Sequence, residues 1–148
     1  MQSLGSEMKK LSFLIIAVIV LVIHACTEKQ EVVEQTHEDG TPKTVVTYLV
    51  ENDQKIKLST KQFYKNGQLE LQGDFDKDGK RHGAWIYNYK TGTRWSEAEY
   101  EHGLRQGESA VYYENGKLRY KGKYKEDKTI GKWFFYDEKG NLVKELMY

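Results

Sequence analysis

The sequence contains one cysteine and one proline in 148 residues, and its formal net charge is only +1. A single cysteine cannot form a disulfide within the chain, so the fold must be stable without cross-links. The absence of a basic excess argues against a nucleic-acid-binding protein. Metalloprotease, nucleophile-elbow and phosphate-loop motifs are also absent, and His37, His82 and His102 share no ligand spacing. The sequence therefore predicts a protein that is not an enzyme and needs no cofactor or metal.

The chain has one long hydrophobic run, Leu11 to Ile23, which follows Lys9 and Lys10. At about 13 residues the run is too short to span a bilayer comfortably, and it is typical of a signal peptide. It ends in Ile-His-Ala-Cys at positions 23 to 26. An apolar residue at −3, a small residue at −1 and a cysteine at +1 resemble the bacterial lipobox.

This resemblance implies that the signal peptidase recognises Ile23 and Ala25 and that Cys26 carries the lipid and becomes the mature N-terminus. Two or three acyl chains would hold the protein firmly on a membrane. We therefore expect an exported protein anchored in the bacterial cell envelope, at the outer membrane where the cell has one. The alternative is an uncleaved N-terminal anchor with a chance cysteine. Met8 is a second candidate start, because it gives the more usual signal-peptide layout.

The sequence divides into three parts: a signal peptide over residues 1–25, a flexible tether over 26–39 and a folded domain over 40–148. The tether prediction rests on the polar, acidic stretch TEKQEVVEQTHED, which has no sustained period. A short helix from Glu28 to Gln35 is the alternative for this stretch.

The folded part is repetitive. Three glycines, Gly83, Gly107 and Gly131, recur every 24 residues. A second series of turn glycines recurs at intervals of 25, 24 and 24, and each of its members is followed eight residues later by an aromatic residue. The second series is Gly67, Gly92, Gly116 and Gly140, and the aromatic residues are Phe75, Tyr100, Tyr124 and Tyr148. Eleven tyrosines and three tryptophans favour strands over helices.

Alternation with a period of two indicates strands in which one face is wet, joined by short turns into an antiparallel meander. Asn66-Gly67 and Asn115-Gly116 are typical of two-residue type I′ hairpins. The alternation places Leu118, Tyr120, Gly122 and Tyr124 on one face, and Arg119, Lys121, Lys123 and Lys125 on the other. Small residues recur on the first face, at Gly73, Ala98 and Gly122, and we expect them to leave room for rings of the next strand, such as Trp85, Tyr112 or Trp133.

The segment from Gly73 to Gly92, GDFDKDGKRHGAWIYNYKTG, resembles a MORN repeat. It is similar to the variant repeats of bacterial lipoproteins and of YwqK-type antitoxin components. The resemblance covers about Thr60 to Tyr148, with a weaker extension back to Gly40. It implies an all-β, elongated, twisted sheet of successive hairpins and no particular activity.

Three surfaces are candidates for binding. The acids of DFDKDG, which are Asp74, Asp76 and Asp78, match the opening of a calcium loop, although Trp85 stands where its last ligand belongs. The basic row Arg119, Lys121, Lys123 and Lys125 predicts an anion site, and the alternative is a solvated face balanced by Glu97, Glu99 and Glu101. The aromatics Trp85, Trp95 and Trp133 could line a binding surface, and the parity of Trp95 places it on the acidic, wet face.

The favoured function is a protein-interaction scaffold at the cell envelope. Val143 to Tyr148 is predicted to be a sheet edge, which could pair with a partner strand or a second copy. The alternatives are a module that binds an envelope glycan or an anionic lipid, and an antitoxin-like neutralising protein.

Overall fold

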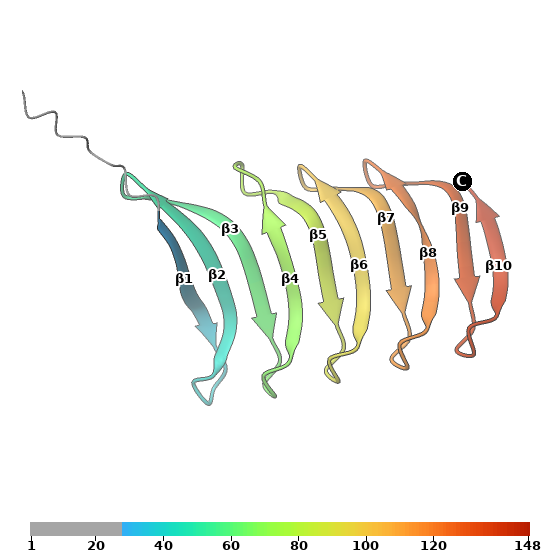
Figure 1. Cartoon of the computed structure of the whole chain (residues 1–148), viewed down its shortest axis with the longest axis horizontal. Coiled ribbons are helices and arrows are strands. Elements are labelled where there is room, and N and C mark those ends of the chain that lie inside the picture. The colour runs from blue at the N-terminus through green and yellow to red at the C-terminus, as the bar shows by residue number, and fades with distance from the viewer. Residues whose placement is uncertain (1–27) are drawn as a thin grey trace, which may run out of the picture.

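The computed structural model describes residues 28–148, which form a single antiparallel sheet of ten strands in chain order, with β1 and β10 at its edges (Figure 1). The described part contains no helix. The predicted all-β meander is therefore confirmed. The strands are β1 (Glu28–Thr36), β2 (Pro42–Glu51), β3 (Gln54–Phe63), β4 (Leu69–Phe75), β5 (Arg81–Asn88), β6 (Arg94–Glu101), β7 (Leu104–Tyr112), β8 (Leu118–Lys125), β9 (Lys128–Tyr136) and β10 (Leu142–Met147).

The predicted tether is in large part a strand. Residues Glu28–Thr36 form β1 and pair with β2 from Glu28↔Val50 to Thr36↔Pro42. Both the flexible-tether prediction and the alternative of a helix are therefore wrong for this segment. An edge strand that is exposed on both faces shows no hydrophobic alternation. Its stability comes from the backbone hydrogen bonds that it forms with β2, a strand rich in β-branched residues. The predicted signal peptide and Cys26 lie outside the described residues.

The loops at one end of the strands share one form, and three of the four loops at the other end share a second form, while the fourth, from Asp76 to Lys80, has the first form. At one end Asn66-Gly67 and Asn115-Gly116 belong to longer loops, in which the first N–H bonds the fifth C=O and only the glycine has a left-handed φ. This is a type I turn followed by a bulge, so the prediction of type I′ turns there was wrong. At the other end Asn52-Asp53, His102-Gly103 and Glu126-Asp127 have positive φ at both residues, as a type I′ turn requires.

Two of the three predicted small-residue sites are directly confirmed. A Cβ on Gly73 would lie 2.3 Å from Cδ2 of Trp85, and a Cβ on Gly122 would lie 2.1 Å from Cδ2 of Trp133. Each tryptophan ring therefore lies against the glycine of the preceding strand. In the repeat between them, Ala98 stands in place of the glycine and pairs with Ser109, which stands in place of the tryptophan. Where the ring is absent, the glycine is absent too.

The series Gly83, Gly107 and Gly131 lies inside strands β5, β7 and β9 and not in the turns between strands. All three have positive φ, and the strand register shifts beside each of Gly83 and Gly107. From Gln72↔Ile86 to Asp74↔His82 the strand that holds Gly83 takes up two extra residues, and a left-handed glycine allows such a bulge without breaking the sheet.

A second series of bulges occurs near the start of the even-numbered strands. The register passes from Tyr87↔Ser96 to Asn88↔Arg94, which leaves Trp95 as the extra residue. Glu70, Arg119 and Val143 hold the same place in β4, β8 and β10. These bulges reverse the alternation at the first residue of each strand. Leu118 was predicted to share a face with Tyr120, and this prediction was wrong, because the bulge at Arg119 lies between them.

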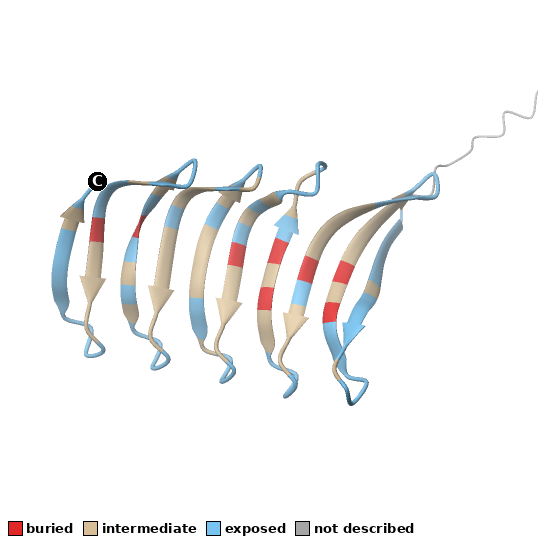
Figure 2. Cartoon of the chain, turned by 180° about the vertical axis from the view of Figure 1, so that it is seen from behind, coloured by how far each residue is buried: buried red, intermediate tan, exposed pale blue. Residues whose placement is uncertain are grey.

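The core is thin, because the sheet is one layer. Figure 2 shows that the buried residues are scattered across the middle of the strands. They are Thr44, Val46, Thr60, Leu71, Gly73, Trp85, Gly122 and Trp133. Hydroxyl-to-carbonyl hydrogen bonds repeat between neighbouring hairpins: Tyr64 donates to the C=O of Asn88, Tyr89 to that of Tyr112 and Tyr113 to that of Tyr136. These bonds tie each hairpin to the next.

Candidate interaction surfaces

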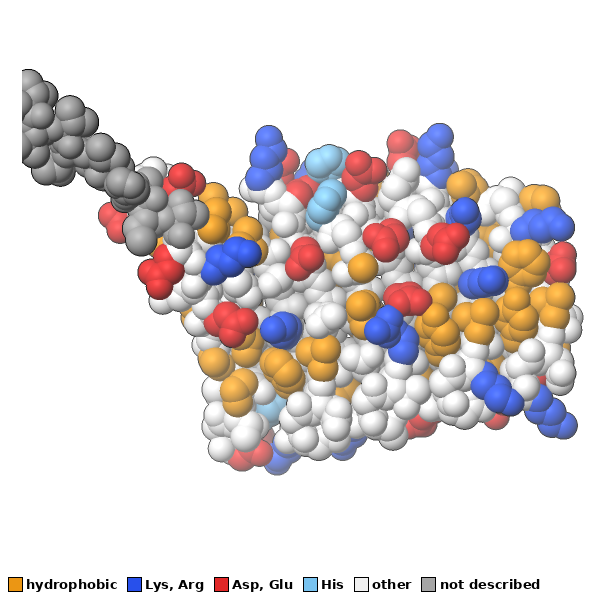
Figure 3. All heavy atoms as spheres, viewed as in Figure 1, with side chains coloured by type: hydrophobic (Ala, Val, Ile, Leu, Met, Phe, Trp, Pro, Cys, Tyr) orange, Lys and Arg blue, Asp and Glu red, His pale blue; other side chains and the backbone are white. Residues whose placement is uncertain are grey.

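The two faces of the sheet differ chemically. We call the face that carries Trp85 and Trp133 the aromatic face. The opposite face, viewed in Figure 3, carries acidic and basic side chains with hydrophobic side chains between them, and we call it the charged face. Paired residues share a face, so the register gives one row across the charged face: Ile86, Glu97, Ala110, Lys121, Phe134 and Glu145.

A groove of about 610 Å³ lies on the charged face over β5–β9. Three acids line it over β6 and β7, and three lysines line it over β8 and β9. The acids are Glu97, Glu99 and Glu108, and the lysines are Lys121, Lys123 and Lys132. Its remaining lining is small or apolar and includes Ala84, Ala98, Ser109, Ala110, Tyr112, Leu118, Gly122 and Phe134.

The groove exists because one repeat has a small residue where its neighbours have large ones. In the row across the charged face, Ala110 of β7 stands between Ile86 of β5 and Phe134 of β9, two strands away on each side. A methyl group there leaves a hollow that a larger side chain would fill.

Glu97 is held in a defined position at the acidic side of the groove. The Tyr112 hydroxyl donates a hydrogen bond of 2.7 Å to Glu97 Oε1, and Arg94 pairs with Oε2 of the same carboxylate. Burial and this hydrogen bond raise the pKa of Tyr112 to about 12, because both disfavour the phenolate. Tyr112 therefore stays protonated and keeps donating throughout the physiological range.

The basic side of the groove is only partly neutralised. Lys123 Nζ lies 3.4 Å from Glu108, and Lys132 Nζ lies 3.8 Å from Glu145. Lys121 lies over the Phe134 ring at 5.8 Å from its centroid. Exposed ion pairs of this kind contribute little to stability, so the side chains can exchange partners at small cost.

The structure divides the predicted basic row. Lys121 and Lys123 line the groove, whereas the Arg119 guanidinium lies over the Tyr113 ring at 5.6 Å because Arg119 occupies the bulge. Lys125 pairs with Lys128 at the end of the strand, outside the groove lining. The row is therefore not one continuous anion site.

The predicted aromatic surface is also divided. Trp85 and Trp133 are 2% and 4% exposed, so their rings belong to the core and not to a binding surface. Trp85 Nε1 donates to the C=O of Asp74 at 3.0 Å. Trp95 is 44% exposed, but its bulge turns the ring toward Tyr87, with centroids 6.0 Å apart, and away from the acidic row. Its predicted face was therefore wrong, while its exposure is confirmed.

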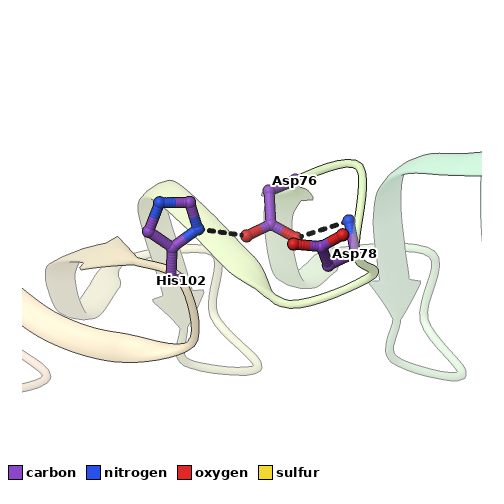
Figure 4. A group of neighbouring side chains, drawn as sticks. All are labelled: Asp76, Asp78 and His102. Carbon is purple, nitrogen blue, oxygen red and sulfur yellow. Dashed lines mark hydrogen bonds and ion pairs between the residues drawn. The ribbon is translucent and has the colours of Figure 1, made fainter.

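The acids of DFDKDG are split between a strand and a turn. Asp74 lies in β4 opposite His82, while Asp76 and Asp78 lie in the next loop, where His102 of the neighbouring turn approaches them (Figure 4). His102 Nδ1 is 2.8 Å from Asp76 Oδ2, and side-chain ligand atoms of Asp76, Asp78 and His102 lie within 4.8 Å of one another.

Asp76 acts first as the cap of its own loop. Its Oδ1 accepts hydrogen bonds from the N–H groups of Lys80, at 2.9 Å, and Asp78, at 3.0 Å. The bond from Lys80, followed by the contact with His102 and the bond from Asp78, holds the pKa of Asp76 below its ordinary value. Asp137 caps the last loop in the same way, so this arrangement has a structural role in the repeat. Asp76, Asp78 and His102 are the residues that could hold a cation, and Asp74 is not among them.

The C-terminal strand offers an exposed edge. In β10 Val143 and Met147 are 61% and 69% exposed, and Leu142 and Tyr148 are also exposed. Within the sheet formed by residues 28–148, β10 pairs with β9 alone, so its other edge has no strand partner there. This agrees with the predicted sheet edge over Val143 to Tyr148.

The sequence comparisons identify the repeats. A family model described as the MORN repeat variant matches residues 59–77, 81–102, 105–126 and 130–148, which is more than half of the chain. The chain belongs to the MORN repeat variant family. Each MORN match covers much of one hairpin, from β3–β4 to β9–β10, while the hairpin of β1 and β2 lies outside the matches. Repeats of this family generally serve as modules for interaction with proteins or membranes.

Searches of curated proteins and of solved structures found no match to this MORN protein. Within residues 28–148, no helix is long and apolar enough to cross a membrane. The groove residues Glu108, Ala110 and Lys132 were not predicted from the sequence. The signal that could have found them is the departure of the third repeat from its neighbours at Ser109 and Ala110.

Proposed function

We propose that this protein is a non-catalytic module, anchored in the bacterial cell envelope by a lipid on Cys26, that binds a protein partner on its charged face. The observation that carries the proposal is the groove over β5–β9, in which Glu97 is fixed by Tyr112 and faces lysines two strands away. A hollow lined by both signs of charge favours a partner of mixed charge over a uniformly anionic lipid.

The proposed anchor would bring the sheet close to the membrane. Only Thr27 separates Cys26 from Glu28, the first residue of β1. Even a fully extended chain spans at most about 7 Å over two residues. With no long tether, the end of the sheet that holds Glu28 and the type I′ turns would lie next to the lipid headgroups.

Anchoring is tested by Cys26→Ala in cells labelled with a palmitate analogue. We expect the variant to lose both the label and its membrane fractionation, while the neighbouring substitution Thr27→Ala keeps both. Unchanged labelling and fractionation of Cys26→Ala would show that the protein is not a lipoprotein.

Partner binding is tested by a photocrosslinking amino acid placed at Lys121 in the groove or at Lys43 in β2 as the control. Because replacing Lys121 removes a charge of the groove, the same amino acid is also placed at Lys132, which lines the groove and pairs with Glu145. We expect a stoichiometric protein adduct from Lys132 and none from Lys43, and we expect the filling substitution Ala110→Phe to remove it. An adduct at both Lys132 and Lys43, or one that persists when the groove is filled, would contradict binding in the groove. Retention on lipid or cell-wall fractions without a protein adduct would support the glycan or lipid alternative, and a toxin gene beside this one would support an antitoxin-like role.

A further inference from the structure

We infer that the groove binds an extended peptide segment whose basic and acidic side chains are separated by about three residues. The inference rests on the proposed protein-binding function and specifies the chemistry of the partner. It follows from the charge distribution, the strand spacing and the floor of the groove.

On the acidic side and on the basic side of the groove, one charged side chain has no ion-pair partner among the described residues. Among the described residues, Glu99 over β6 and Lys121 over β8 form no ion pair, whereas Lys123 and Lys132 each lie near a glutamate. Glu99 and the fixed carboxylate of Glu97 complement a cation. Lys121 complements an anion, and its ammonium also lies over the Phe134 ring. A uniformly charged ligand would gain on one side of the groove and be repelled on the other.

The strand spacing sets the distance between the two charges of the ligand. Strands β6 and β8 are second neighbours, and adjacent strands lie about 4.8 Å apart, so the acidic and basic rows are separated by about 10 Å. A peptide in the polyproline II conformation rises about 3.1 Å per residue with three residues per turn, so side chains three residues apart lie on the same face, about 9 Å apart, and reach the two rows. Such a peptide crosses the strands and uses the groove floor, so it need not pair with a sheet edge.

The floor of the groove limits what lies between the two charges. Ala110 provides a methyl group, while Leu118 and Phe134 provide apolar walls. Small or apolar residues between the two charges would therefore be accommodated. The peptide is the occupant that these features fit, because a lipid headgroup would use only the lysines.

The experiment uses the full-length protein in detergent and three fluorescein-labelled octapeptides with cores Lys-Ala-Ala-Glu, Lys-Ala-Ala-Lys and Glu-Ala-Ala-Glu. Fluorescence anisotropy at low salt gives the affinities. We expect the mixed-charge peptide to bind at least tenfold more tightly than either of the others. Lys121→Glu should weaken it at least tenfold and strengthen binding of the Lys-Ala-Ala-Lys peptide, whereas Lys43→Glu, the same charge change in β2, should alter neither.

A second variant tests the floor. Ala110→Phe should abolish binding of the mixed-charge peptide, and circular dichroism should show an intact sheet because Phe134 occupies the same row. If that variant does not fold, the Lys121→Glu result alone decides. Equal affinity for the three peptides, or no change with Lys121→Glu, overturns the inference.

Two further readouts separate other occupants. Binding to vesicles of 30% phosphatidylglycerol that is stronger than binding to the mixed-charge peptide, and that Lys121→Glu removes although the lipid anchor is intact, would assign the lysines to lipid and overturn the inference. Concentration-dependent dimerisation that Ala110→Phe removes would assign the groove to a second copy and overturn it too. If the photocrosslinked partner persists while the peptides fail to bind, the proposed function stands and only the ligand chemistry is wrong.

Discussion

The contact between Gly122 and Trp133 offers the most direct test of how the repeats pack. In Gly122→Ala the added Cβ would lie 2.1 Å from Cδ2 and 2.2 Å from Cε2 of the Trp133 ring. Ordinary contacts of this kind are about 3.5 Å or longer. The ring must therefore move by more than 1 Å, although Trp133 is buried between Tyr120, Tyr124 and Tyr148.

We expect Gly122→Ala to lower the free energy of unfolding by about 1 to 3 kcal/mol, which is the range for an overpacked core. In a Trp133→Ser background the sign should reverse. The ring is then gone, and alanine in a strand interior is more stable than glycine by about 0.5 to 1 kcal/mol. The chain already contains this combination, because Ala98 pairs with Ser109 one repeat earlier.

The measurement is equilibrium urea unfolding, followed by far-UV circular dichroism, of the wild type, both single variants and the double variant. The two effects of Gly122→Ala should differ by about 1.5 to 4 kcal/mol, which is a coupling energy between the residues. With a urea dependence of about 1 to 3 kcal/mol/M, the shifts in midpoint are easily measured. A coupling energy below about 0.5 kcal/mol would refute the conclusion that glycine is required there by the tryptophan ring.

Three further predictions concern the loops and the ties between hairpins. Glu126→Asn should raise the free energy of unfolding by about 0.5 to 1 kcal/mol in urea, because Glu126 has a φ of 51° and asparagine tolerates that region better; no gain would contradict the type I′ turn. Hydrogen bonds from Asn141 hold the pKa of Asp137 below 3.8, so its stabilising effect is complete above that value and is lost as pH falls through the lowered pKa. As the pH is lowered below about 4, the urea midpoint of the wild type should therefore decrease, and it should decrease less steeply in Asp137→Asn. The same dependence of the midpoint on pH in both proteins would contradict this. Tyr89→Phe should cost about 0.5 to 1.5 kcal/mol in the same assay, because it removes the bond to the C=O of Tyr112; an unchanged midpoint would show that the bond contributes nothing.

The fold was predictable because its determinants are local and repeated. Glycines at a fixed spacing, strong alternation and tyrosine-rich strands together indicate a meander of hairpins. The prediction failed where two residues of the same type play different parts. Gly67 ends a loop and Gly83 forms a bulge, and both have positive φ. A sequence reports the need for a left-handed residue but not which structure needs it.

The faces were harder to predict than the strands. One bulge in each even-numbered strand changes the parity, which moved Leu118 into the groove and turned Trp95 toward Tyr87. The edge strand β1 was missed for a related reason. Its pairing with β2 uses backbone groups, which leave little trace in side-chain composition.

The sequence by itself determined the repeat length, the strand order and the pairing of each buried tryptophan with a glycine, because these depend on residues close along the chain. Only the tertiary structure decided which side chains meet across strands. The groove is made of the five strands from β5 to β9 together, and its charges converge only after the bulges have set the register. Contacts between strands depend on that register, and a shift of one residue would send every one of these side chains to the other face.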